Sequence, residues 1–235
     1  MIDRVSALYD KTCTCRHCQQ TFTTKRVRGG QQAMVRRDAD FCTYYKEQLF
    51  NPILYTVNVC PACGYAFTDL FAEKLPLAVK RMVTDRIASK WTPKDFGHIR
   101  SMGDSIACYK LAIYAAEITG EAHSVKAGLY LRLAWLHRFR NEALEEQRFL
   151  NMAVHEYEQS YVHGDYQKGD KDMTDVRMLY LIGELMRRVG RFDQAVIYFS
   201  KVLEYHGRTM ETGILQMARD QWALAREEYK KHHPA

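Results

Sequence analysis

The sequence predicts an α+β protein that is mainly α, with a small β-rich head followed by a larger helical body. Six of the seven cysteines lie before residue 64, among short β-like segments and tight turns. The pattern changes from about Pro76, and beyond Asp104 nearly all of the chain has helical periodicity. We therefore expect three parts, which are a head of residues 1–72, a helix and linker over 73–103, and a helical domain over 104–235.

Composition indicates a soluble, globular protein. The 235 residues are 47% apolar and 26% charged, which suffices for a buried core. The N-terminal MIDRVSALYDK has scattered charges and no apolar signal-peptide core, and the longest apolar stretch, LAIYAAEI at 111–118, is much shorter than a membrane span. We therefore expect a cytoplasmic protein with no membrane partner. In that reducing compartment an odd number of cysteines favours metal binding or free thiols over disulfides.

Short strands are expected in the head. The stretch 20–28 (QTFTTKRVR) favours β structure and leads to Gly29-Gly30, after which 31–37 could return as the second arm of a hairpin. Residues 53–60 (ILYTVNVC) alternate apolar and other side chains, which predicts a half-buried strand. The aromatic-rich stretch between them, DADFCTYYKEQLFNP, is expected to form a loop. Such a head is too small to fold by burial alone.

Two cysteine pairs of identical spacing predict a metal site. Cys15-x-x-Cys18 and Cys60-x-x-Cys63 can each place two thiolates around a tetrahedral metal ion. Four sulfur ligands leave no open position, which indicates one structural Zn²⁺ and a zinc-ribbon-like head. The second pair is the stronger signal because the following Gly64 permits a positive φ. The alternatives are buried apolar cysteines or a redox pair, although the sequence lacks the βαβ pattern expected around a redox CxxC.

Three cysteines lie outside these pairs. Cys13 and Cys15 have the spacing that puts side chains on one face of a strand, so Cys13 could lie near the metal without binding it. Cys42 lies in the aromatic loop, where a small buried thiol is the simpler interpretation, and Cys108 is expected in a helix core. Cys13 and Cys42 are therefore the candidates for an accessory thiol role.

The head is also basic. The stretch 11–37 holds seven lysines and arginines and no acid. Such a face could bind an acidic partner or nucleic acid, with Phe22, Tyr44 or Tyr45 stacking on bases. The cations expected to contact phosphates are Lys25, Arg26, Arg28, Arg36 and Arg37.

The stretch 176–209 fits a tetratricopeptide module. Gly183 takes its small-residue position, Gly190 its inter-helix turn, and Phe199 the position that fills the space between the paired helices. A looser copy, in which Ala134 takes the place of Gly183, lies earlier by one module plus the length of the polar loop 161–175. The alternative is an ordinary helical bundle without a groove.

The first helices of such modules line a concave face. Its expected partner-binding side chains are Trp135, Arg138, Arg177, Tyr180, Glu184, Arg187 and Arg188, together with Phe139. Four arginines with aromatic neighbours would suit an acidic or C-terminal peptide. Alternatively, Arg187 and Arg188 form only a solvated helix end. Further helices are expected over 76–89, 104–119 and 211–231, the last as a solubilising cap.

The order of these motifs resembles a known bacterial family. The stretches YDKTCTCRHCQQTFTTKRVR, RRDADFCTYY and NPILYTVNVCPACGYAF, followed by RLAWLHR and LYLIGELMRRVGRFDQAV, are similar to domain-of-unknown-function family 2225 over nearly the whole chain. The resemblance implies a zinc-binding, cysteine-rich head and a tetratricopeptide-like body, with no established activity. It also makes DFC, with Cys42, part of the family pattern. The family's first cysteine pair usually reads CPxCG, and CRHCQ differs from it.

Three hypotheses for the function follow. The first is a non-catalytic adaptor or scaffold that binds a protein or acidic peptide through the helical groove, with a structural zinc site in the head. The second is a nucleic-acid-binding protein that uses the basic head. The third, a metal- or thiol-dependent enzyme, is the least favoured because HExxH, P-loop and Ser/His/Asp patterns do not stand out in the sequence.

Overall fold

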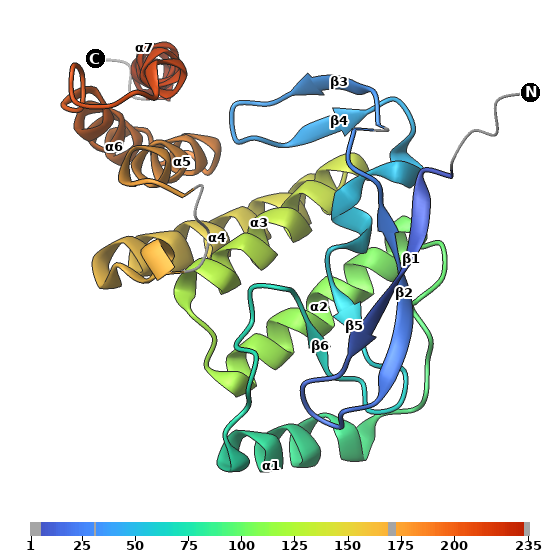
Figure 1. The fold of residues 1–235 in the computed structure, drawn as a ribbon. Helices are drawn as coiled ribbons and strands as arrows, with labels where there is room; N and C mark the ends of the chain where they lie inside the picture. Colours follow the sequence, from blue (N-terminus) through green and yellow to red (C-terminus); the bar gives the residue numbers. More distant parts are fainter. Residues whose placement is uncertain (1–5, 31, 169–172, 233–235) are drawn as a thin grey trace, which may run out of the picture. The chain divides into compact units, whose positions relative to one another are not determined.

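The computed structural model describes residues 6–30, 32–168 and 173–232 (Figure 1). It is mainly helical with short antiparallel hairpins, which confirms the predicted α+β class. The chain forms two compact units. The first holds Met1–Asp38 and Cys42–Glu121, and the second holds Ala39–Phe41 and Ala122–Ala235. Within the described ranges, none of the helices has both the length and the apolarity that a membrane span requires.

The strands of the first unit form antiparallel pairs. β1 (Leu8–Thr14) pairs with β2 (Thr21–Val27), β3 (Met34–Arg37) with β4 (Thr43–Tyr45), and β5 (Asn58–Val59) with β6 (Ala66–Phe67). The turns of the first and third pairs carry the two CxxC sequences. The β-hairpin is therefore the local structure that presents each cysteine pair.

The predicted hairpin of 20–28 with 31–37 is wrong. The turn through the first cysteine pair brings β1 and β2 into register along their whole length, with Cys13 opposite Phe22. β3 is exposed at every residue, so it has no apolar face to pack under β2. It pairs with β4 instead, because the chain turns back over residues 38–42.

The predicted strand over 53–60 is also wrong for most of its length. Residues Pro52–Tyr55 form a 3₁₀ helix, η2, and only Asn58–Val59 is extended. Pro52 favours a helical first turn, and the Asn51 side chain accepts a hydrogen bond from the Ile53 N–H at 3.2 Å. Local capping thus prevails over the alternating apolar pattern.

Two helices complete the first unit. α1 (Leu77–Arg86) follows Pro76, and α2 (Met102–Thr119) begins at Ser101, which forms a capping box with Asp104. α2 contacts β5 and β6 and belongs to this unit (Figure 1). Its Tyr109 hydroxyl donates to the Ile53 carbonyl at 3.1 Å. The unit boundary, after Glu121, therefore differs from the predicted boundaries at 72 and 103.

A buried arginine links the segments of the first unit. Arg100 is 1% exposed, although it lies in the stretch predicted to be a linker. Its guanidinium donates to the carbonyls of Leu54 (3.1 Å), Val57 (2.8 Å) and Phe96 (2.8 Å), and to the Thr24 hydroxyl (3.2 Å). Because these acceptors come from three separate stretches of the chain, Arg100 joins β2, η2 and the segment before α2.

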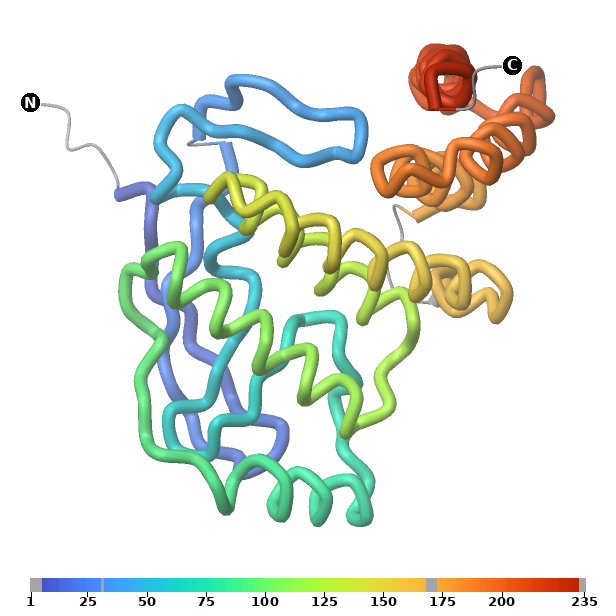
Figure 2. The backbone as a smooth tube through the Cα atoms, turned by 180° about the vertical axis from the view of Figure 1, so that it is seen from behind, coloured from blue at the N-terminus to red at the C-terminus, as the bar shows by residue number. Residues whose placement is uncertain are grey.

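The second unit is a series of helices. They are α3 (His123–Phe139), α4 (Ala143–His163), α5 (Asp175–Arg188), α6 (Phe192–Leu203) and α7 (Thr212–His232). α3 packs against α4, α5 against α6, and α7 against both α5 and α6, as the backbone in Figure 2 shows. A Cβ on Gly183 would lie 3.0 Å from the Phe199 ring, so this glycine allows the close approach of α5 and α6, as predicted.

The predicted polar loop 161–175 is shorter than expected. α4 continues to His163 and ends at Gly164, whose φ is +65°. A 3₁₀ turn, η4 (Asp165–Lys168), follows, and α5 begins at the Thr174 cap. Residues 169–172 of the predicted loop lie outside the described part of the chain.

Candidate metal centre and carboxylate pocket

The four cysteines of the two CxxC pairs lie together in the first unit. Their Sγ atoms are all within 4.8 Å of one another, and both Cys15–Cys63 and Cys18–Cys60 are separated by 3.6 Å. A tetrahedral ion with Zn–S bonds of ~2.3 Å requires sulfur separations of about 3.8 Å. This four-cysteine cluster, as we call it, could therefore bind a metal ion, and the predicted ligands are the residues that form it.

The two turns of the cluster have the same backbone pattern. Cys15 N–H donates to the Gln20 carbonyl (2.9 Å) and Gln19 N–H donates to the Cys15 carbonyl (3.0 Å). The same two bonds recur from Cys60 to residue 65 and from Gly64 to Cys60. Gln19 has φ +64° where Gly64 has φ +72°. CRHCQ thus adopts the turn of CPACG, at the cost of a left-handed glutamine of about 1 to 2 kcal/mol.

The stretch predicted to be a linker packs onto these turns. A Cβ on Gly64 would lie 2.4 Å from the Trp91 ring, and the Trp91 indole donates to the Pro61 carbonyl at 2.9 Å. On the other turn, His17 Nε2 lies 3.0 Å from the Thr84 hydroxyl of α1. Neither contact was predicted from the sequence, because Trp91 and Thr84 are distant in the chain from the cysteine turns that they contact.

Hydrogen bonding among the thiols changes their protonation. Bonds with Cys15 and Cys63 lower the pKa of Cys60 to about 2, whereas the bond with Cys60 raises the pKa of Cys15 to about 12. The bond with Cys15 likewise raises the pKa of Cys63. One thiolate thus forms at the expense of its neighbours, because several negative charges cannot share a buried site without a cation. A metal ion would replace these protons.

The remaining cysteines are buried thiols outside the cluster. Cys13 Sγ donates to the Asn58 side chain at 3.6 Å, and burial raises the pKa of Cys13. Burial also raises the pKa of Cys108 to about 11, and Cys42 is fully buried. Raised pKa values and burial both disfavour a reactive thiolate.

Acidic residues reach the basic face from outside the acid-free stretch. Lys11 pairs with Asp69 (3.0 Å). Three of the five candidate phosphate-binding cations also form ion pairs, Lys25 with Asp10 (2.8 Å), Arg26 with Asp69 (3.8 Å) and Arg36 with Asp38. Arg28 lies over the Tyr9 ring, and Arg37 donates to the Thr43 hydroxyl at 3.2 Å. The charge predicted for phosphate binding is therefore partly neutralised.

In the second unit, several predicted groove residues surround a buried aspartate. Asp40, in the three-residue segment that belongs to this unit, is 0% exposed. Arg138 donates to both of its carboxylate oxygens (3.1 and 2.7 Å), and the Trp135 indole donates to Oδ2 (3.0 Å). Arg188 Nε lies 3.6 Å from the same oxygen. With Tyr180, these three residues form what we call the carboxylate pocket.

Two further contacts hold the residues on either side of Asp40. The Tyr180 hydroxyl donates to the Ala39 carbonyl at 2.8 Å, and the rings of Phe41 and Tyr180 are 5.6 Å apart. Phe41 has φ +68°, a left-handed conformation that costs a non-glycine residue about 1 to 3 kcal/mol. The Ala39–Phe41 segment is therefore bound through its backbone, its carboxylate and its aromatic ring.

The two arginines of the carboxylate pocket determine the protonation state of Asp40. Burial by itself would raise the Asp40 pKa, but the hydrogen bond and charge of Arg138, with the charge of Arg188, hold it below its usual value. The aspartate is therefore ionised at neutral pH. A bidentate arginine–carboxylate pair of this kind is among the stronger polar contacts in proteins.

Every arginine of the predicted groove also has an acidic neighbour within the unit. The pairs are Arg138–Glu146 (2.7 Å), Arg187–Glu184 (2.9 Å), Arg187–Glu228 (3.0 Å), Arg188–Glu184 (2.7 Å) and Arg177–Glu211. Glu184 is itself fully buried. Neither Arg187 nor Arg188 is a solvated helix end, because their side chains are only 12% and 20% exposed.

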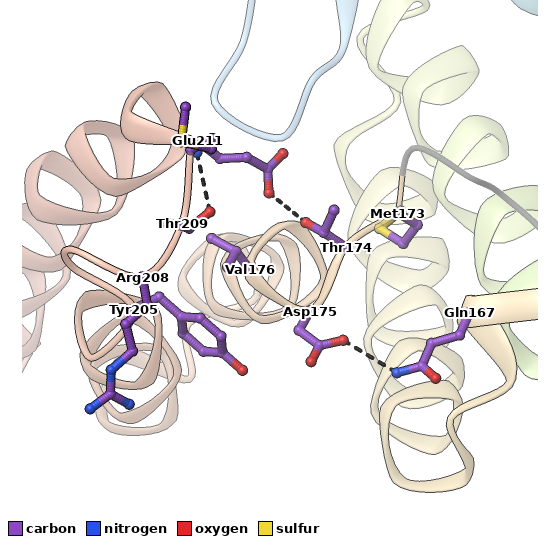
Figure 3. Close-up of a pocket in the computed structure, with 10 residues that line it drawn as sticks. Gln167, Met173, Thr174, Asp175, Val176, Tyr205, Arg208, Thr209 and Glu211 are labelled. Atoms are coloured by element: carbon purple, nitrogen blue, oxygen red, sulfur yellow. Dashed lines mark hydrogen bonds between the residues drawn. The ribbon is translucent and has the colours of Figure 1, made fainter.

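Arg177 lies apart from the carboxylate pocket, at the first turn of α5. A shallow hollow of about 490 Å³ opens beside this turn (Figure 3). Its lining residues are Gln167, Met173, Thr174, Asp175, Val176, Tyr205, Arg208, Thr209, Met210 and Glu211. The Thr174 hydroxyl and Arg177 both donate to Glu211, so this acid ties the start of α5 to the start of α7.

The sequence profile of one bacterial family matches residues 8–225. Its description is "Uncharacterized protein conserved in bacteria (DUF2225)". The matched range includes the four-cysteine cluster and the Ala39–Phe41 segment, and it confirms the resemblance found from the motifs. No match was found among curated proteins or among solved structures.

Proposed function

The chain belongs to the bacterial family DUF2225, and we propose that it is a non-catalytic adaptor whose helical unit binds a protein partner. The observation that carries this proposal is the carboxylate pocket on α3 and α5. It offers two guanidinium groups and an indole N–H to a single carboxylate. Such convergent donors are the means by which proteins recognise acidic peptides.

The head contributes stability in this proposal. Four thiolates would hold one Zn²⁺ ion and leave no position for a substrate or water, as in structural sites. The ion would fix the two hairpin turns against each other. A cytoplasmic location would suit such a site, because a reducing compartment keeps the thiols free to bind the metal.

The other two hypotheses have less support. Three of the five candidate phosphate-binding cations face acids, which reduces the attraction of the head for nucleic acid. The candidate accessory thiols, Cys13 and Cys42, are buried, which disfavours thiol chemistry. Adaptor function is therefore the hypothesis to test first.

The test is affinity capture with the full chain, followed by reconstitution. Arg138→Glu reverses the charge at the centre of the pocket, and Arg148→Glu on α4 is a matched control, because the Arg148 side chain is 59% exposed. A partner that binds through the pocket is captured by wild type and by Arg148→Glu but lost with Arg138→Glu, and the purified partner repeats this pattern. Adaptor function through this pocket is refuted if Arg138→Glu, shown to be folded by circular dichroism, keeps every partner.

A further inference from the structure

We infer that the carboxylate pocket recognises an aspartate followed by an aromatic residue, and that the Ala39–Phe41 segment is an internal ligand that a partner peptide displaces. This inference rests on the proposed adaptor function and names the chemical class of the partner. The partner segment would be a short linear peptide that reproduces the contacts of Ala39, Asp40 and Phe41.

The contacts to Asp40 explain why an aspartate is required. Both carboxylate oxygens receive hydrogen bonds, and the group is completely buried. A neutral asparagine would present an NH₂ group to donors that need an acceptor, and it would lack the charge that Arg138 and Arg188 face. The pocket therefore selects an ionised carboxylate.

The contacts on either side extend recognition to three consecutive residues. Tyr180 contacts the residues on both sides of the aspartate. Its hydroxyl donates to the carbonyl of the preceding residue, and its ring packs against the aromatic ring of the following residue. These contacts involve only residues 39–41 and the helices of the second unit. A peptide supplied by another molecule could make all of them.

Two features indicate that the internal ligand can be displaced. Phe41 is held in a left-handed conformation within a loop that the Asp38 N–H to Cys42 carbonyl bond closes at 2.8 Å. A peptide without that closure can reach the pocket with a relaxed backbone, which offsets part of the advantage that the internal segment has because it belongs to the same chain. In addition, Arg138 and Arg188 retain Glu146 and Glu184 as neighbours when Asp40 leaves. Opening the pocket therefore does not leave an unpaired buried charge.

The experiment uses a fluorescent peptide, RRDADFSTYY, which copies residues 36–45 with serine in place of Cys42. Its anisotropy is titrated with the full chain, either wild type or Asp40→Asn. We expect Asp40→Asn to bind this peptide at least tenfold more tightly than wild type, because its own segment no longer competes. A control peptide, RRDANFSTYY, should not bind.

Adding Arg138→Gln to Asp40→Asn should abolish binding, and Asp38→Asn should behave like wild type.

The Trp135 indole resonance and circular dichroism show whether each variant is folded. If Asp40→Asn fails to fold, Asp40→Glu replaces it, because it keeps the charge but fits poorly, and a smaller gain in affinity is expected. Equal binding of the peptide to wild type and the folded variant overturns the inference, as does no binding to the folded variant. If affinity capture nevertheless finds a partner that depends on Arg138, the adaptor function is supported and only the specificity for an aspartate followed by an aromatic residue is refuted.

Discussion

The four-cysteine cluster and the carboxylate pocket satisfy buried charge in opposite ways. In the first unit, four thiols meet at one point, and their proximity raises the pKa of Cys15 and Cys63 as Cys60 ionises. In the second unit, a carboxylate meets guanidinium groups of the same chain, and its pKa falls. The first site could take a cation from solution, whereas the second is completed by the chain itself. Loss of the metal ion should therefore unfold the first unit, whereas release of Asp40 should only open the carboxylate pocket.

The largest effect is expected from removing a cysteine ligand. Cys60→Ser should abolish zinc binding and unfold the first unit, since structural zinc contributes on the order of 10 to 16 kcal/mol of apparent binding free energy. The helices of the second unit should persist. Zinc content by mass spectrometry, limited proteolysis and circular dichroism measure this. Cys13→Ser is the matched control, and its loss of zinc to the same extent would contradict the assigned ligands.

Arg100 is a buried guanidinium that donates to neutral carbonyl and hydroxyl oxygens, in contrast to Arg138, which donates to carboxylates. Arg100→Met should destabilise the first unit by about 2 to 5 kcal/mol, because it leaves buried carbonyls without donors at roughly 1 to 3 kcal/mol each. Arg100→Lys should rescue little, since an ammonium lacks the planar fork. Urea unfolding measures both variants. A loss below about 1 kcal/mol for Arg100→Met would show that water replaces its bonds.

The two turns of the cluster allow a smaller, paired test. Gly64→Ala should cost more than about 2 kcal/mol, because it adds a left-handed penalty to the clash with Trp91. Gln19→Gly should instead stabilise the head by about 1 kcal/mol, by relieving the same conformation. Thermal unfolding of the zinc-loaded protein compares them. The two substitutions should change the free energy of unfolding in opposite directions. A change in the same direction would contradict the shared turn geometry.

The lowered pKa of Asp40 predicts an effect of pH on the second unit. A carboxyl whose folded pKa lies below its unfolded value stabilises the fold above the unfolded value, near 3.8, and this contribution is lost as pH falls through the folded pKa. Asp40→Asn should flatten the acid dependence of stability below about pH 4. Urea unfolding followed by helical circular dichroism at several pH values measures this. Asp38→Asn serves as the control, and an unchanged slope in Asp40→Asn would contradict the assignment.

The smallest effect is expected from nucleic acid. With Lys25, Arg26 and Arg36 facing acids, an electrophoretic titration of the full chain should give no shift, or a shift with a shallow salt dependence. A steep fall in affinity with salt, reduced by Arg28→Ala and Arg37→Ala, would favour the nucleic-acid hypothesis instead.

Local patterns made the four-cysteine cluster predictable from the sequence, whereas they did not predict which residue occupies the carboxylate pocket. CxxC spacing describes a turn, so each pair of candidate ligands follows from residues close together in the chain. Asp40 and Trp135 are 95 residues apart, and no local rule relates them. The arginines around the pocket were predicted from their positions on the first helices of the tetratricopeptide-like modules, but their acidic neighbours depend on how the helices pack. The only signal for the occupant was the DFC element of the family pattern.

The predicted hairpin was wrong, and the predicted basic face is partly neutralised, for a related reason. Gly29-Gly30 is a strong turn signal, yet β2 pairs with β1 instead of β3, because the cysteine turn aligns β1 and β2 along their whole length. The charge of 11–37 was counted along the chain, while Asp10 and Asp69 lie outside that stretch. Interactions that cross between segments decided both outcomes.

The second unit is discontinuous, because three of its residues come from the middle of the first unit's sequence. A fragment cut at residue 121 would leave Asp40 behind and expose the arginines and indole that it covers. Such a fragment is expected to bind aspartate-containing peptides that the intact chain keeps out, so partners found with the isolated helical unit need confirmation with the uncut chain. Dissecting this protein at its apparent domain boundary would thus create the very binding site that the experiment sets out to detect.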